Sequence, residues 1–133
     1  MFRITIVTLC ASMLISAAPA IACTGPNPAI EWVKVQSVVP QGGENRFTIA
    51  GNIVNMGSSQ PLNVLQYVSI SAYGQRLDRR SIPPLRAGQP FSWIFPYFRS
   101  TQSGRGTTTL DFQIVMEQGV NCNPANGHRS LTF

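Results

Sequence analysis

Apolar side chains recur at every second position through most of the sequence after residue 30. In residues 107–117, for example, Leu110, Phe112, Ile114 and Met116 are separated by single residues. A period of two belongs to a β-strand that buries one face, whereas an amphipathic helix has a period of about 3.6. No stretch of ten residues has the helical pattern. The alternation therefore predicts an all-β fold.

Turn-forming residues divide this pattern into seven short segments. Gly and Asn allow the positive φ that tight turns need, and Pro presets φ; such residues cluster between the segments, as in Pro40-Gln41-Gly42-Gly43. Strands spaced about 8–12 residues apart predict an immunoglobulin-like, seven-stranded antiparallel β-sandwich, with a five-stranded barrel as the alternative. The predicted strands cover residues 31–39, 46–55, 62–73, 76–82, 89–95, 107–117 and 129–133. In the first, Val33, Val35 and Val39 are expected to share one face.

The first 22 residues have the features of a secretory signal peptide. Arg3 precedes an apolar run over residues 4–15, and Ala20-Ile21-Ala22 offers a small-residue cleavage site. The apolar run is shorter than the roughly 20 residues of a membrane-spanning helix, so no transmembrane segment is expected. Residues 23–133 are then one domain, expected in the periplasm or outside a bacterial cell.

Cleavage after residue 22 removes Cys10 and leaves two cysteines, Cys23 and Cys122. An even pair in an oxidising compartment predicts a disulfide. If every strand connection reverses direction, the two cysteines lie at the same end of the sandwich, because one precedes the first strand and the other follows the sixth. The alternative is that Ala20-Ile21-Ala22-Cys23 is a loose lipobox. A lipidated Cys23 could not pair with Cys122.

Four elements within residues 29–133 occur in a characteristic order. They are an Asn-x-Gly turn after a strand, a second strand running into a Gly turn, an x-Pro-x-Leu-x-x-Gly connector and an Asn-rich loop: Ile53-Val54-Asn55-Met56-Gly57, Ala72-Tyr73-Gly74-Gln75, Ile82-Pro83-Pro84-Leu85-Arg86-Ala87-Gly88 and Asn121-Cys122-Asn123-Pro124-Ala125-Asn126. This order resembles the CARDB family, immunoglobulin-like bacterial domains named for a relation to cell adhesion. The resemblance implies a role in adhesion or interaction. Family members often have acidic residues in the last loop, whereas residues 118–133 contain none, so no metal role is expected there.

The residues that catalysis or metal binding would need are scarce. His128 is the one histidine, and with both cysteines paired no zinc ligand set remains. Asp111 and Glu117 share a strand face but would be about 20 Å apart, too far for an acid–base pair. No nucleophile elbow, phosphate loop or dinucleotide fingerprint occurs in the sequence. The chain is therefore expected not to be an enzyme and to need no cofactor or metal.

Arginine is concentrated in residues 76–105, with Asp78 as the one acidic residue among them. Arg pairs with carboxylates and phosphates and stacks on aromatic rings. One hypothesis is that these side chains bind an anionic envelope component or a protein; the other is that they keep a surface of low charge soluble and protect an edge strand. No basic–aromatic motif points to a nucleic acid partner. The cluster consists of Arg76, Arg79, Arg80, Arg86, Arg99 and Arg105.

Five aromatic residues lie within residues 91–98. Three of them alternate and are expected in the core: Phe91, Trp93 and Phe95. Tyr97 and Phe98 follow a proline, which cannot donate to a strand ladder, and are expected to be exposed at the start of a loop over residues 99–106. Rimmed by arginines, they would form a binding spot.

These features favour a secreted, non-catalytic binding or adhesion module of the bacterial cell envelope. Two alternatives stay open: a structural subunit that self-associates through its sheet edges, and a small secreted inhibitor that presents the 99–106 loop. The predicted contact residues are Arg76, Arg79, Arg80, Tyr97, Phe98, Arg99 and Arg105.

Overall fold

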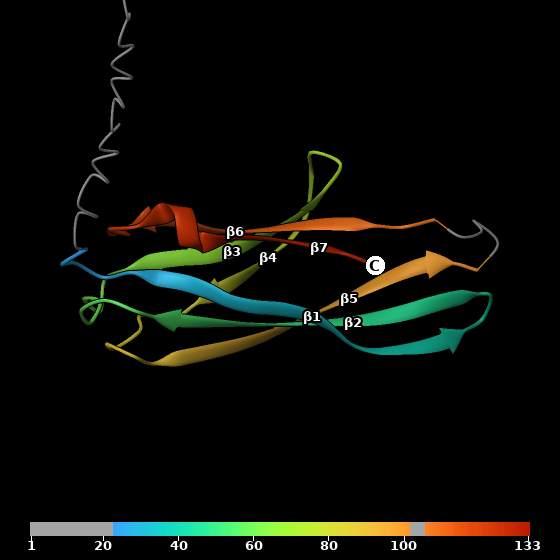
Figure 1. Cartoon of the computed structure of the whole chain (residues 1–133), viewed down its shortest axis with the longest axis horizontal. Helices are drawn as coiled ribbons and strands as arrows, with labels where there is room; N and C mark the ends of the chain where they lie inside the picture. Colours follow the sequence, from blue (N-terminus) through green and yellow to red (C-terminus); the bar gives the residue numbers. More distant parts are fainter. Residues whose placement is uncertain (1–22, 102–105) are drawn as a thin grey trace, which may run out of the picture.

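A computed structural model describes residues 23–101 and 106–133. The chain forms two antiparallel sheets stacked face to face (Figure 1). The three-stranded sheet has the order β1-β2-β5, with β1 Pro28–Gln41, β2 Glu44–Asn55 and β5 Pro90–Ser100. The four-stranded sheet has the order β4-β3-β6-β7, with β3 Leu65–Ala72, β4 Gln75–Ile82, β6 Thr109–Gln118 and β7 His128–Thr132. The prediction of an immunoglobulin-like, seven-stranded antiparallel sandwich is therefore confirmed.

The core lies between the sheets and is built from alternate residues of each strand. Ile49 and Ile53 of β2 face Val68 and Ile70 of β3 and Phe112 of β6, and all five side chains have no exposed surface. Full burial of one such side chain contributes about 1.5–3 kcal/mol to the free energy of folding. The aromatic residues of β5 follow the same alternation, because Trp93 and Phe95 are buried and Phe91 is partly buried against the core, as predicted.

Two irregularities in β1 change which of its residues face inward. The pairing with β2 shifts between Ile30 and Trp32, so Ile30 and Val33 both reach the core side. It shifts again between Val35 and Ser37, which places Val39 opposite Arg46 of β2. The expectation that Val39 shares the inward face is therefore wrong, and its side chain is 53% exposed.

Two predicted strand boundaries are also corrected. The third strand does not begin at Leu62, which is 94% exposed and lies in a turn before Leu65. The fifth strand does not end at residue 95; it continues to Ser100, because residues 96–100 stay paired with β2. The loop before the last strand contains a short 3₁₀ helix, Pro124–Gly127.

Asn55 joins three separate segments at one end of the sandwich. Its buried side chain donates hydrogen bonds to the carbonyl oxygens of Ser58 (2.8 Å) and Leu85 (3.0 Å). Its Oδ1 accepts hydrogen bonds from the backbone N–H groups of Asn27 (3.0 Å) and Gly57 (3.1 Å). The Asn-x-Gly turn and the connector between β4 and β5 therefore meet at this residue.

Cys23 and Cys122 form the predicted disulfide, with Cα atoms 5.6 Å apart. The bond closes a separation of 99 residues and ties the start of the described chain to the segment after β6. It uses the Cys23 sulfur that a lipid thioether would require.

Residues 1–22, the predicted signal peptide, lie outside the described residues. Within residues 23–101 and 106–133, no helix has the length and apolar character needed to cross a membrane.

Candidate functional site

An open hollow runs along the flank of the sandwich where the edge strands β4 and β5 lie on the same side. It has a volume of about 450 Å³, and we call it the β4–β5 hollow. Strand β4 contributes Arg80 and Ser81, and β2 contributes Arg46 and Thr48. Residues 91–94 and 96 of β5 complete the lining. The hollow therefore combines side chains from three strands that are distant in the sequence.

Arg80 enters this hollow from the core side of the four-stranded sheet. It pairs with Val68, whose side chain is fully buried, so both residues point toward the space between the sheets. One guanidinium nitrogen lies 3.1 Å from Asp78 Oδ2. The Nε atom is buried and has no hydrogen-bond partner among the described residues. A buried donor without an acceptor costs about 1–3 kcal/mol in the free energy of folding. The Arg80 side chain as a whole is 39% exposed, so its other guanidinium N–H groups can donate to an anionic ligand atom.

Trp93 is a second lining residue with a buried, unpartnered donor. Its ring lies 5.1 Å from that of Phe112 and is 5% exposed overall. The ring also covers Gly51, the residue that pairs with Trp93 in β2, and a Cβ at Gly51 would overlap with it. Its Nε1 atom has no hydrogen-bond partner in the described part of the chain. Two N–H groups without acceptors thus belong to residues that line one hollow.

The charge of the hollow is positive. Arg46 alternates with the buried Phe47 and therefore faces outward from the three-stranded sheet. Among the described residues Arg46 has no ion pair, and no acidic residue lines the hollow. Thr48, Ser81 and Ser92, which carry hydroxyl groups, also line the hollow. This combination suits a ligand group that carries negative charge and accepts hydrogen bonds.

The predicted arginine cluster does not form one patch. Arg79 points to the opposite face of β4 from Arg80, where its guanidinium carbon lies 5.2 Å from the centre of the Tyr67 ring. It also pairs with Glu117 at 3.4 Å. Arg76 is exposed near the β3–β4 turn. Of these three arginines, Arg80 alone lines the β4–β5 hollow.

The second group of predicted contact residues belongs to β5 rather than to a loop. Tyr97 is partly buried, and its ring packs edge-on against Phe133 at 5.7 Å. Arg99 donates hydrogen bonds to Phe133 O (2.8 Å) and Thr108 Oγ1 (3.1 Å), so it links the two sheets. Phe98 is exposed on the outer face, opposite Arg46. Arg105 lies outside the described residues.

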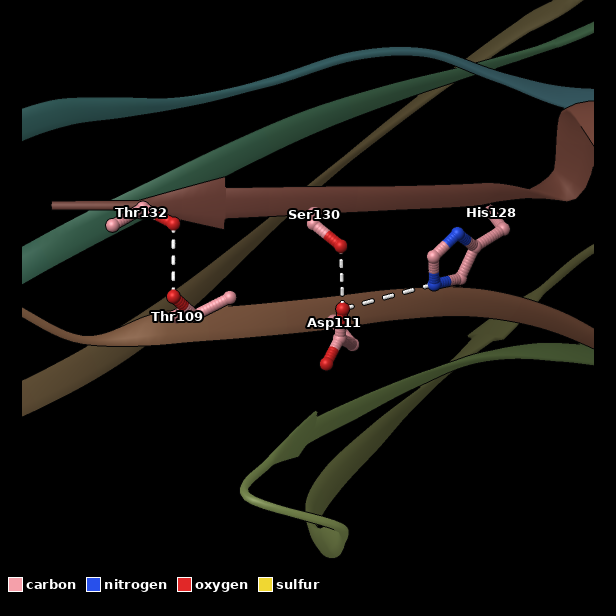
Figure 2. A network of polar contacts seen from close by, with 5 residues as sticks. All are labelled: Thr109, Asp111, His128, Ser130 and Thr132. Carbon is pink, nitrogen blue, oxygen red and sulfur yellow. Dashed lines mark hydrogen bonds and ion pairs between the residues drawn. The ribbon is translucent and has the colours of Figure 1, made fainter.

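The one histidine lies in a polar row on the outer face of β6 and β7 (Figure 2). Ser130 Oγ donates to Asp111 Oδ1 at 2.5 Å, and His128 Nε2 lies 3.7 Å from the same oxygen. Ser130 and His128 therefore both contact the Asp111 carboxylate and not each other. In a serine that histidine activates, the hydroxyl group would instead donate a hydrogen bond to the imidazole. Among the described residues no group of three or more His, Cys, Asp and Glu could hold a metal ion.

Arg46 and Thr48 of the hollow were not among the predicted contact residues. They lie about 30 residues before the arginine-rich segment, and the pairing of β2 with β5 brings them to the flank. The signal available in the sequence was their alternation with Phe47 and Ile49, which indicates an outward orientation.

Comparisons with protein-family models, with curated proteins and with solved structures found no match.

Proposed function

We propose that residues 23–133 are a secreted, non-catalytic binding module of the bacterial cell envelope. The module binds an anionic group of its partner in the β4–β5 hollow. The observation that carries this proposal is the convergence of Arg46 and Arg80, from different sheets, on a hollow lined by hydroxyl groups and by no described acidic residue. A carboxylate or phosphate offers acceptors for the guanidinium groups of Arg46 and Arg80, which line the hollow.

The cysteines and the N-terminal segment support the proposed location of the module outside the cytoplasm. A disulfide such as Cys23–Cys122 persists in oxidising compartments, which agrees with the predicted signal peptide over residues 1–22. The resemblance to CARDB domains favours an adhesion or interaction role. Kinship with that family is part of the proposal.

A second candidate is an assembly subunit that polymerises through a sheet edge. The observation in its favour is that β1 is an edge strand and exposes Val38 and Val39 beyond its second irregularity. Light scattering over a range of protein concentrations separates the two candidates. A monomer at every concentration supports the binding module. Particles that grow with concentration, and that Val39→Lys abolishes, support assembly.

Binding to immobilised polyanions tests the proposed function. The exported protein is passed over polygalacturonate and poly-glutamate, and Arg46→Gln/Arg80→Gln is compared with Arg76→Gln/Arg79→Gln. Both double variants remove the same charge, so a nonspecific electrostatic attraction weakens equally in both. The proposal expects at least about a tenfold loss for the first pair and little change for the second. Equal losses, or no binding by the unmodified protein, would overturn it.

A further inference from the structure

A second hollow adjoins the first on the outer face of the three-stranded sheet. It has a volume of about 250 Å³, and we call it the Trp32 hollow. Trp32 and Gln36 of β1 line it on one side, and Ser92, Trp93 and Ile94 of β5 line it on the other. The same three β5 residues also line the β4–β5 hollow. The two hollows therefore share one wall and form a continuous surface across β5.

The polar groups of this surface are held in place by one another. Trp32, Asn52 and Ser92 lie side by side across the three strands. Ser92 Oγ donates to Asn52 Oδ1 at 3.1 Å, and Asn52 Nδ2 donates to Glu31 Oε2 at 2.6 Å. Because these contacts fix the side chains before a ligand arrives, little entropy is lost when a ligand forms hydrogen bonds with them.

The surface also carries an accessible aromatic ring and further positive charge. Trp32 is 37% exposed, and Lys34 Nζ lies over its ring, 4.7 Å from the centre, so a sugar ring that stacks on this face takes the place of the ammonium group. In the next row, Lys34, Ala50 and Ile94 lie side by side, and the small Ala50 leaves space between the longer side chains. An indole with an apolar face and ordered hydrogen-bonding neighbours suits a sugar ring, which has apolar C–H faces and a polar rim.

An extended peptide fits this flank less well. A peptide that added a strand to β5 would need backbone N–H donors along its free edge. Pro90 and Pro96 lie at the start and in the middle of β5 and have no N–H group. The three cations Lys34, Arg46 and Arg80 outnumber the two neighbouring carboxylates, Glu31 and Asp78, so the net positive charge instead complements a ligand with negative charges.

We propose that the two hollows together bind an acidic oligosaccharide. One sugar carboxylate occupies the β4–β5 hollow beside Arg46 and Arg80, and a neighbouring sugar ring lies against Trp32. This inference rests on the proposed function, because it names the ligand whose anionic group enters the first hollow.

Calorimetric titration of the exported protein tests this assignment with four probes: galacturonic acid, trigalacturonic acid, its methyl ester and tri-glutamate. The trimer is expected to bind at least about tenfold more tightly than the monomer. Trp32→Ala is expected to remove that gain, whereas Arg80→Gln weakens the binding of both the monomer and the trimer. The methyl ester, which has lost its charges, is expected to bind weakly. Tyr73→Ala is the control, because Tyr73 lies in the β3–β4 turn and is 79% exposed.

The outcomes separate the two proposals. If monomer binding depends on Arg80, but the trimer binds no more tightly and Trp32→Ala has no effect, only the oligosaccharide assignment is overturned. Tri-glutamate that binds as tightly as the trimer also overturns it, in favour of an acidic peptide. No binding of any probe overturns the proposed function as well. If Trp32→Ala fails to fold, Trp32→Gln replaces it in the same titration, and a trimer affinity that Trp32→Gln leaves unchanged counts against stacking at Trp32.

Discussion

Arg79 and Arg80 are consecutive in the chain but face opposite sides of the four-stranded sheet. Arg79 lies over Tyr67 and pairs with Glu117 on the outer face, whereas Arg80 turns between the sheets and pairs with Asp78. Both ion pairs are partly exposed, yet the surroundings of the two arginines differ. The two residues should therefore respond differently to the same substitution.

Charge reversal at Arg79 and at Arg80 should lower the free energy of unfolding by different amounts. Arg79→Glu replaces an exposed ion pair with two exposed carboxylates that water and salt screen, so we expect a loss of at most about 1 kcal/mol in the free energy of unfolding. Arg80→Glu places a second carboxylate beside Asp78 at the mouth of the core, so a larger loss is expected. Chemical denaturation of both variants measures the difference. An equal loss in both would show that Arg80 is not held between the sheets.

Asn55 should be among the residues most sensitive to substitution. Among the described residues, Asn55→Ala leaves the N–H groups of Asn27 and Gly57 and the carbonyl oxygen of Ser58 without hydrogen-bond partners, whereas the Leu85 carbonyl still accepts a hydrogen bond from the Gln60 N–H. Unpaired buried groups cost about 1–3 kcal/mol each, so we expect a loss of about 3 kcal/mol or more. Asn63→Ala, at an exposed position before β3, is the matched control and should change stability by less than about 0.5 kcal/mol. Similar urea midpoints for the two variants would contradict the role of Asn55.

Gly51 should tolerate no side chain, because the Trp93 ring occupies the space in which a Cβ would lie. Gly51→Ala is expected to cost about 1–3 kcal/mol through overpacking and to alter the near-ultraviolet circular dichroism of Trp93. Gly25→Ala adds a Cβ 3.6 Å from the nearest Cys122 atom, an ordinary contact, and serves as the control. A Gly51→Ala protein with unchanged stability and unchanged aromatic dichroism would refute this packing.

The disulfide should account for a large part of the stability. On the chain-entropy model, a closed loop of about 100 residues contributes about 4.7 kcal/mol at 25 °C. Cys23→Ser/Cys122→Ser should therefore unfold at markedly lower denaturant concentration than the unmodified protein. Thiol titration and intact-mass measurement of the exported protein supply the second check. We expect no free thiol, and a reactive Cys122 thiol together with a lipid-sized mass increase would contradict the disulfide.

The architecture was predictable because its determinants are local. Strand alternation and turn formation both depend on short stretches of chain. The alternation of buried residues at Leu110, Phe112 and Ile114 and the turn at Gly42-Gly43 appear where the sequence predicts them. The reversal of direction at every turn also placed Cys23 and Cys122 at one end of the sandwich.

The predictions that were wrong concern residues whose orientation or neighbours depend on how the strands pair. A shift of one residue in the register of β1 moved Val39 to the outer face, and no local pattern marks that shift. The arginines were grouped by closeness in sequence, although the period of two already implied that Arg79 and Arg80 diverge. Arg46 was missed because its approach to β5 depends on the order of strands in the sheet.

The central claim is that an anionic ligand group enters the β4–β5 hollow, and chemical-shift mapping tests it most directly. Galacturonic acid is titrated into isotope-labelled protein while the backbone amides, the two indole N–H signals and the arginine Nε–H signals are followed. We predict the largest shifts at Arg80 Nε–H, at the Trp93 indole and at the Ser92 amide, with little change at Arg76 and Arg79. Shifts that centre on Arg79 and Tyr67, with an unmoved Trp93 indole, would contradict the claim.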